Sequence, residues 1–314
     1  MKDLLRTQDL SRDDVELLLE TAAAFAEDPL RSKSALANKS VAIYMTKPST
    51  RTRLSSETAV AHLGGTPIFI RGDELQLGRG ETIEDTAKII SGYCSALIIR
   101  TFAQSDVDQL GAYASIPVIN ALTDVDHPTQ LLADWLTIRE NFGTDISGRK
   151  FVYLGDGNNM SHAWLIMGAI MGAHVVAATP SGKWAPDPVV VAVAKNIAAN
   201  SGGKVEVTND PEAAAKDASV LYTDVWMSMG DSESDRAEKV LALSPYAVTE
   251  NLMKISSKDS LFMHCLPAHR GEEVEASVID GPRSVIWREA YHRRTTIQSI
   301  LYHLVRGDLK GYTH

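Results

Sequence analysis

Short apolar runs typical of buried strands alternate with helix-like patterns along almost the whole chain. In the first half, each apolar run is followed by a segment with helical spacing. The expected strands are 41–45, 67–70, 96–100 and 117–120, and the expected helices are 12–27, 52–63, 82–93 and 105–114. This alternation predicts a parallel sheet with helices on both faces.

A second alternating set follows a long helix expected at 128–142 and a break at 143–148. Its expected strands are 150–154, 173–178, 204–207, 219–223, 260–263 and 284–286, before a last helix at 291–306. A chain of 314 residues is long enough for two domains. We therefore predict an α/β protein of two similar-sized domains, 1–142 and 148–290, joined by long linking helices. We expect helix 291–306 to pack back on the first domain.

Charge and composition exclude several classes of function. The net charge is −9, and no basic tail or stripe offers a nucleic-acid surface. No apolar run is long enough to span a bilayer, and the first residues lack the apolar core of a secretory signal. We therefore expect a cytoplasmic protein without nucleic-acid or membrane partners. The two cysteines, Cys94 and Cys265, do not form a disulfide framework, and we expect Cys94 to be a packing residue.

The strand expected at 41–45 is followed by the most informative polar cluster, Ser49-Thr50-Arg51-Thr52-Arg53, at a helix start. A helix N-terminus favours anions through its free N–H groups and its dipole. Arginine adds a planar fork that matches phosphate oxygens. The cluster therefore predicts a site for a phosphorylated small molecule, whereas the alternative is a capped helix with solvated arginines.

Polar groups also follow the other expected strands, where open α/β sheets bind ligands. These groups are Arg100, Asp126-His127-Pro128-Thr129-Gln130, Gly155-Asp156-Gly157-Asn158-Asn159, Asp224 to Gly230, and His264-Cys265-Leu266-Pro267. Taken singly, Arg100 could pair with a surface carboxylate and His127 could cap a helix. Together they predict one functional edge in each sheet.

Several alternative chemistries fit these segments less well. Gly155-x-Gly157 lacks the third glycine and the later acidic residue of a dinucleotide fingerprint, which argues against NAD. Cys265 could be a nucleophile, but His264 would point to the opposite face of a strand and is a poor candidate for its base. A metal site at His264, Cys265 and His269 would lack further ligands. We expect no metal and no organic cofactor.

Four motifs together resemble the ornithine carbamoyltransferases, within the aspartate/ornithine carbamoyltransferase superfamily. The motifs are Ser49-Thr50-Arg51-Thr52-Arg53, His127-Pro128-Thr129-Gln130, Asp224-Val225-Trp226-Met227-Ser228-Met229-Gly230 and His264-Cys265-Leu266-Pro267. The first two are shared with the aspartate enzymes, and the last two distinguish the ornithine enzymes. Their order and spacing agree over nearly the whole chain.

The resemblance implies two sets of binding residues. The carbamoyl phosphate set is Ser49, Thr50, Arg51, Thr52, Gln76, Arg100, His127, Gln130, Cys265, Leu266 and Arg293, with Gln76 reaching a neighbouring subunit's site. The ornithine set is Asn159, Asp224, Ser228 and Met229. Arg51, Arg100, His127, Cys265 and Arg293 would be the catalytic residues. The family forms homotrimers or multiples of trimers, with sites at subunit interfaces and without metal or cofactor.

The implied reaction is direct attack of the δ-amine of ornithine on carbamoyl phosphate, through a tetrahedral intermediate, giving citrulline and phosphate. It would serve arginine biosynthesis or arginine catabolism. The segment 228–236 would close over ornithine. Ser56, Asp126 and Tyr291-His292 depart from the family pattern, and Asp126 could hydrogen-bond the His127 imidazole and raise its pKa. Two alternatives stay open, namely carbamoyl transfer to another amine such as putrescine or a modified ornithine, and a non-catalytic relative.

Overall fold

The computed structural model describes residues 1–75, 80–228 and 232–311. The chain separates into two compact units, which are described in turn. Unit 1 contains Met1–Leu136 and Tyr291–His314, and unit 2 contains Thr137–Ala290. Over the described ranges, no helix combines the length and the apolar character needed to cross a membrane.

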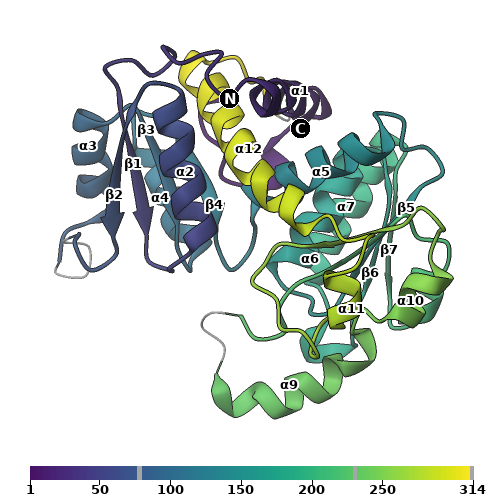
Figure 1. Ribbon diagram of the computed structural model, residues 1–314. Coiled ribbons are helices and arrows are strands. Elements are labelled where there is room, and N and C mark those ends of the chain that lie inside the picture. Colours follow the sequence, from purple (N-terminus) through teal and green to yellow (C-terminus); the bar gives the residue numbers. More distant parts are fainter. Residues whose placement is uncertain (76–79, 229–231, 312–314) are drawn as a thin grey trace. The chain divides into compact units, whose positions relative to one another are not determined.

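Unit 1 is built on a parallel sheet of four strands in the order β2-β1-β3-β4 (Figure 1). The strands are β1 (Ser40–Met45), β2 (Thr66–Arg71), β3 (Ala96–Arg100) and β4 (Val118–Leu122). The helices are η1 (Thr7–Asp9), α1 (Arg12–Glu27), α2 (Thr50–His62), α3 (Ile83–Tyr93), α4 (Gln104–Tyr113), the first part of α5 (Pro128–Phe142) and most of α12 (Ile286–Arg306). Because all four strands are parallel, their carboxyl ends lie at one edge of the sheet.

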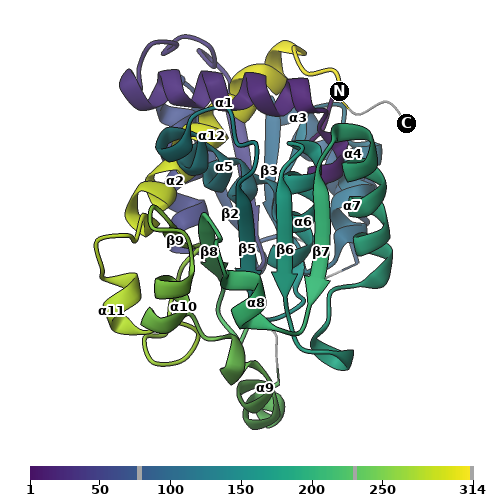
Figure 2. The same ribbon diagram turned by 90° about the vertical axis from the view of Figure 1, so that its right-hand side faces the viewer.

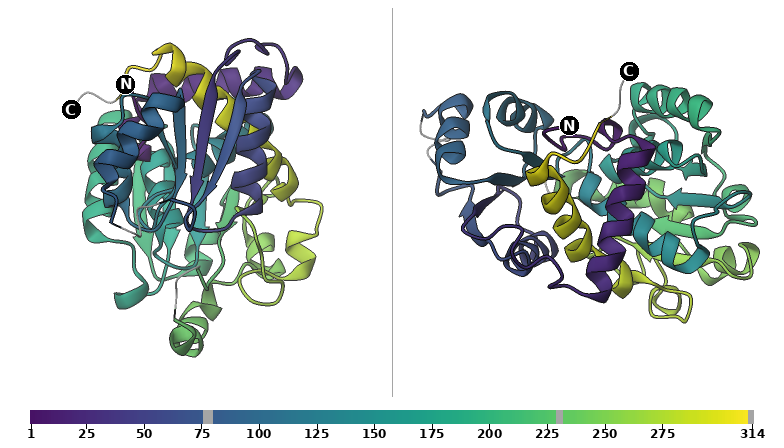
Figure 3. Two further views of the ribbon diagram at one scale, coloured as in Figure 1. Left: turned by 90° about the vertical axis from the view of Figure 1, so that its left-hand side faces the viewer. Right: turned by 90° about the horizontal axis from the view of Figure 1, so that it is seen from above.

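Helices α3 and α4 cover one face of this sheet. Their apolar residues pack with Ala42 and Tyr44 of β1 and with Leu97 and Ile99 of β3 in one buried cluster. Helices α1 and α12 run side by side, as the view from above in Figure 3 shows. Hydrogen bonds join them, among them one from Ser299 Oγ to the Leu18 carbonyl at 2.8 Å and one between Thr21 Oγ1 and His303 Nε2 at 2.8 Å. The C-terminal helix is therefore an integral part of unit 1.

Unit 2 is built on a parallel sheet of five strands in the order β7-β6-β5-β8-β9, seen face-on in Figure 2. The strands are β5 (Lys150–Leu154), β6 (His174–Ala178), β7 (Lys204–Thr208), β8 (Val220–Thr223) and β9 (Leu261–His264). The helices are α6 (Asn159–Ile170), η3 (Gly182–Trp184), α7 (Pro188–Ser201), α8 (Pro211–Ala215), η4 (Glu233–Asp235), α9 (Arg236–Leu243), η5 (Ser244–Tyr246), α10 (Glu250–Ile255) and α11 (Ala276–Ile279). The architecture confirms the predicted fold class of two parallel sheets flanked by helices.

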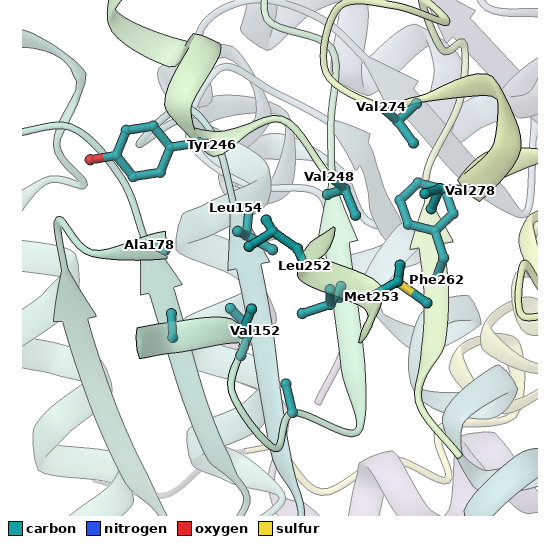
Figure 4. Close-up of a cluster of buried hydrophobic side chains, with 14 of the residues drawn as sticks. Val152, Leu154, Ala178, Tyr246, Val248, Leu252, Met253, Phe262, Val274 and Val278 are labelled. Atoms are coloured by element: carbon teal, nitrogen blue, oxygen red, sulfur yellow. The ribbon is translucent and has the colours of Figure 1, made fainter. Parts of the chain in front are cut away.

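The two faces of the unit 2 sheet have different coverings. Leu252 and Met253 of α10 and Val278 of α11 pack against Val152 and Phe262 of the sheet in a buried apolar cluster (Figure 4). Helices α6 and α7 pack on each other and cover β6 and β7. With both faces covered, the strands read as nearly continuous apolar runs.

The strand expected at 284–286 is wrong. Ser284 makes a single bridge to Phe262, and the Val285 N–H donates to the Phe262 carbonyl at 3.1 Å. The Glu289 N–H then donates to the Val285 carbonyl at 3.0 Å, which closes the first turn of α12. The apolar residues here therefore begin a helix at Ile286, earlier than the expected start at 291.

Candidate active site

The predicted anion-binding loop lies between β1 and α2 of unit 1. Ser49 is the N-cap of α2, and its Oγ accepts a hydrogen bond from the Thr52 N–H at 3.2 Å. Thr52 is fully buried and Arg51 is half-buried. The helix start therefore presents hydroxyl groups and a guanidinium close to its own N-terminus, where the dipole favours an anion.

Arg53 does not join this group in the way the sequence suggested. Its Nε donates to Glu57 Oε1 at 3.0 Å, and its guanidinium lies 3.8 Å from the centre of the Phe69 ring. It lines a surface pocket of about 670 Å³ together with Ser49, Thr50 and Arg71. Arg51 and Arg53 therefore have different surroundings although only one residue separates them.

A buried lysine links the loops that follow three parallel strands. Lys47 forms an ion pair with Asp124 and its Nζ lies 4.2 Å from the centre of the Phe102 ring. The Asp124 N–H in turn donates to the Phe102 carbonyl at 2.9 Å. Sequence reasoning overlooked Lys47, whose place directly before Pro48-Ser49 was the available signal. These contacts hold the loops after β1, β3 and β4 together at one edge of the sheet.

His127 lies at this edge, between β4 and α5, and its side chain is almost completely buried. Burial lowers the pKa of the imidazole well below its usual value, and the positive charges of Arg293, Arg100 and Arg51 lower this pKa further. The ring is therefore neutral at pH 7. A neutral imidazole among three guanidiniums can donate one hydrogen bond without adding a charge.

Asp126 does not act on His127 as expected. Its carboxylate accepts hydrogen bonds from the backbone N–H of His127 at 2.7 Å, and from the N–H and Oγ1 of Thr7 at 2.6 and 2.7 Å. The imidazole ring is not its partner, and the pKa of His127 is lowered rather than raised. Burial raises the pKa of Asp126 itself to about 6, against the hydrogen bonds from Thr7 and His127.

Arg293, from α12, is buried beside the same residues. Its Nη1 donates to Gln130 Oε1 at 2.5 Å, and its Nη2 lies within hydrogen-bonding distance of the hydroxyls of Thr52 (3.3 Å) and Thr129 (3.4 Å). The Gln130 amide in turn donates to Asp134 Oδ1 at 2.7 Å. The structure thus brings together Thr52, His127, Gln130 and Arg293, which are separated by up to 241 residues.

In unit 2, the predicted residues after β8 and β9 meet at Asp224. Its Oδ1 accepts hydrogen bonds from the Cys265 thiol at 2.9 Å and from the Val225 N–H at 2.7 Å. Its Oδ2 accepts one from Asn158 Nδ2 at 3.1 Å. Asn158 was among the polar residues expected after the strand at 150–154, but the ornithine role was assigned only to its neighbour Asn159, which is the first residue of α6. The arrangement presents a buried carboxylate beside a thiol, which suits a bound amine or ammonium group.

The ring of His264 has hydrogen-bond partners in Leu266 and Glu273. His264 Nδ1 accepts from the Leu266 N–H at 2.8 Å, so Nε2 carries the proton and faces Glu273 Oε1 at 3.3 Å. Leu266 has a φ of 57° and its side chain packs against the apolar cluster of unit 2. Ligand-type atoms of Asp224, His264 and Cys265 lie within 4.8 Å of one another, and the hydrogen bonds above already involve each of them.

Four further predicted residues remain, of which the structure describes two. Ser228 is half-buried after β8, and Arg100, the last residue of β3, is buried. Gln76 and Met229 lie outside the described residues. The segment expected to close over ornithine continues into η4 and α9 from residue 233 onward.

Comparison with known proteins identifies the family to which the chain belongs. Residues 2–140 match the carbamoyl-P binding domain of aspartate/ornithine carbamoyltransferase, and residues 147–304 match its Asp/Orn binding domain. The chain belongs to the aspartate/ornithine carbamoyltransferase family. The carbamoyl-P domain contains the loop at Ser49, Arg100 and His127, whereas the Asp/Orn domain contains Asp224 and Cys265.

Individual family members are similar over nearly their full length. The ornithine carbamoyltransferase of Pyrococcus horikoshii is 47% identical over 313 residues, which covers 99% of this chain and 98% of the relative. The solved structure of the Pyrococcus furiosus ornithine carbamoyltransferase superposes with a TM-score of 0.92 at 46% identity, covering 98% of each chain. The anabolic enzyme of Campylobacter jejuni gives a TM-score of 0.91 at 33% identity, covering 98% of this chain and 100% of the other.

Proposed function

We propose that this chain transfers the carbamoyl group of carbamoyl phosphate to the δ-amine of L-ornithine, giving L-citrulline and phosphate in arginine biosynthesis. Family membership supports the reaction class, and the relatives named ornithine carbamoyltransferase support the acceptor. The observation that carries the proposal is the neutral, buried His127 surrounded by Arg51, Arg100 and Arg293. This group suits a doubly charged phosphate next to a carbonyl oxygen.

Carbamoyl phosphate binds to unit 1 in this proposal. The phosphate takes the start of α2, with Ser49, Thr50, Arg51 and Thr52 as donors. Arg100, His127, Gln130 and Arg293 hold the carbamoyl end. As the tetrahedral intermediate forms, negative charge develops on the carbonyl oxygen, and prepositioned donors there are each typically worth about 10²–10³ in rate.

Ornithine binds through unit 2. Asp224, Asn159, Ser228 and Met229 hold the amino acid, and Cys265 and Leu266 lie beside the reacting amine. Attack requires the neutral amine, and an amine like that of lysine has a pKa near ~10.4 in water. Positive charge nearby lowers such a pKa, because like charges disfavour the protonated form. The amine nitrogen then forms a bond to the carbonyl carbon, the C–O bond to phosphate breaks, and the amine loses a proton.

The active assembly is a homotrimer or a multiple of trimers, with Gln76 reaching the site of a neighbouring subunit. This part of the proposal rests on the family resemblance. Sedimentation at assay concentration tests it, because a fully active monomer would contradict it.

The first experiment measures citrulline release from carbamoyl phosphate with ornithine, in parallel with putrescine, N-acetylornithine and aspartate. We expect strong turnover with ornithine alone. Turnover only with another amine would retain the carbamoyl phosphate half of the proposal and refute the ornithine half. Absence of turnover with every amine would refute the catalytic proposal.

A further inference from the structure

The side chain of Asn158 connects the start of α6 to the carboxylate of Asp224. Asn158 is the N-cap of α6, and its Oδ1 accepts hydrogen bonds from the N–H groups of Met160 at 2.9 Å and Ser161 at 3.2 Å. The Tyr153 hydroxyl donates to the same oxygen at 3.2 Å. On its other side, Asn158 Nδ2 donates to Asp224 Oδ2 at 3.1 Å.

These donors determine which way round the amide lies. The two ends of an asparagine amide differ only in that one accepts hydrogen bonds and the other donates them. Two backbone N–H groups can only donate, so the amide oxygen must face the helix. The Tyr153 hydroxyl keeps its proton, because burial and the negative charges of Asp224 and Asp156 raise its pKa well above the usual value. The NH₂ group is therefore held toward Asp224.

The Asp224 carboxylate is consequently fixed from two sides. Cys265 Sγ and the Val225 N–H bind Oδ1, whereas Asn158 Nδ2 binds Oδ2. A carboxylate oxygen has two acceptor positions, so Oδ2 retains one for a ligand. Without Asn158, the described contacts hold the carboxylate at Oδ1 only, and the group could rotate about its terminal bond.

We propose that Asn158 is a positioning residue for ornithine, acting through Asp224 by fixing the direction in which Oδ2 faces the substrate. This inference rests on the proposed function of the Asp224 site. It adds Asn158 to the proposed ornithine-binding residues Asn159, Asp224, Ser228 and Met229.

Two substitutions separate this role from helix capping. Asn158→Ser retains an oxygen that can cap α6 but has no NH₂ group, whereas Asn158→Ala loses both functions. Both variants should raise the KM for ornithine by about 10- to 100-fold, the range expected when a charged group loses one hydrogen bond. The KM for carbamoyl phosphate should stay within about twofold of wild type, and only Asn158→Ala should lower the Tm by a few degrees.

Asp224→Asn serves as the reference in the same assay, because it removes the charge that Asn158 is proposed to orient. A wild-type ornithine KM in Asn158→Ser would overturn the proposal. An equal rise in the KM for ornithine and the KM for carbamoyl phosphate would also overturn it. The same holds if the KM for ornithine rises only in Asn158→Ala, together with a lower Tm. If wild type used another amine, the proposed acceptor would fail, and the same comparison made with that amine would still decide the role of Asn158.

Discussion

The immediate surroundings of His127 decide what its imidazole can do. Burial and three nearby guanidiniums lower the pKa of the ring and keep it neutral, so it can donate a hydrogen bond but does not exchange protons near pH 7. The motif predicted His127 as a member of the site, and the structure buries it near Arg293, Arg100 and Arg51. The sign of its pKa shift was wrong, because Asp126 is adjacent in sequence but binds the backbone of His127 and Thr7 of the N-terminal segment.

Arg51→Ala should abolish measurable turnover while the protein remains folded. Arg51 is half-buried at the start of α2 and contributes a charge beside His127, so its loss removes a donor from the phosphate site. We expect kcat/KM to fall by at least about 10²–10³. Steady-state kinetics would measure turnover, and circular dichroism would show whether the variant is folded. Arg31→Ala, at an exposed position of unit 1, is the matched control. Wild-type rates in folded Arg51→Ala would remove Arg51 from the site.

Asp126→Asn should change how stability depends on pH. In the folded protein the pKa of Asp126 is about 6, against the ordinary value of 3.8 expected in the unfolded chain. Between these values the folded state binds the extra proton, so this carboxyl makes wild type less stable as the pH rises from about 4 to about 6. At 1.36 kcal/mol per pH unit, the loss is about 3 kcal/mol.

Urea unfolding of both proteins at several pH values measures this difference. His127 has the opposite effect, because its lowered pKa makes the folded state more stable as the pH rises toward 6.5. The imidazole is present in both proteins, so its contribution largely cancels in the comparison. A stability difference between Asp126→Asn and wild type that is constant from pH 4 to pH 7 would contradict the prediction.

Individual strands and helices were predictable where the length of a run and the spacing of its apolar residues indicated the same element. The apolar runs at 41–45, 96–100 and 150–154 form strands because both faces of each sheet are covered. The segment Ser284-Val285-Ile286 did not form a strand, since so short an apolar run fits a buried strand or a helix start equally well. The Glu289 N–H bond to Val285 selects the helix, and no pattern in the sequence reports that contact.

Gly168→Ala should destabilise the packing of α6 on β6. A Cβ atom at this position would lie 2.0 Å from Val175 Cγ1 of β6. The strand is held between its neighbours in the sheet, so α6 would have to move away from it. Overpacking of this kind typically costs about 1–3 kcal/mol. Thermal unfolding followed by circular dichroism would measure the loss.

Gly92→Ala, near the end of α3, is the matched control. A Cβ there meets nothing within 4 Å, so the helix should gain up to about 1 kcal/mol. A Gly168→Ala variant as stable as Gly92→Ala would show that α6 and β6 are less tightly packed than the structure indicates.

At the scale of the molecule, the proposed mechanism assigns carbamoyl phosphate to one parallel sheet and ornithine to the other, at the carboxyl ends of the strands. The rule that ligands bind at these ends located Ser49, His127, Asp224 and Cys265 from sequence alone. It could not assign Lys47 or Asn158, whose importance lies in contacts with Asp124 and Asp224, 77 and 66 residues away. Such partners are set by tertiary packing, and local patterns do not encode them.

Ending the chain after Ala290 should unfold unit 1 and spare unit 2. Four residues of α12, namely Ile297, Ile300, Leu301 and Leu304, are buried in unit 1. Hydrogen exchange should show lost protection in β1–β4 and retained protection in β5–β9. Ending the chain after Arg306 is the control, because it removes only the residues that follow α12. Full protection of β1–β4 without 291–314 would contradict the assignment of α12 to unit 1.

The return of α12 to the first unit also has a consequence during synthesis. A ribosome completes residues 1–136 first, yet the helix that packs beside α1 is made after all of unit 2. Unit 2 has its whole sequence available earlier, and domains generally fold as units. The nascent N-terminal part must therefore wait, with its α1 face uncovered, for about 150 further residues, which at about 5–20 residues per second takes roughly 8–30 seconds. Chaperone dependence of this protein should accordingly concentrate on its first 136 residues.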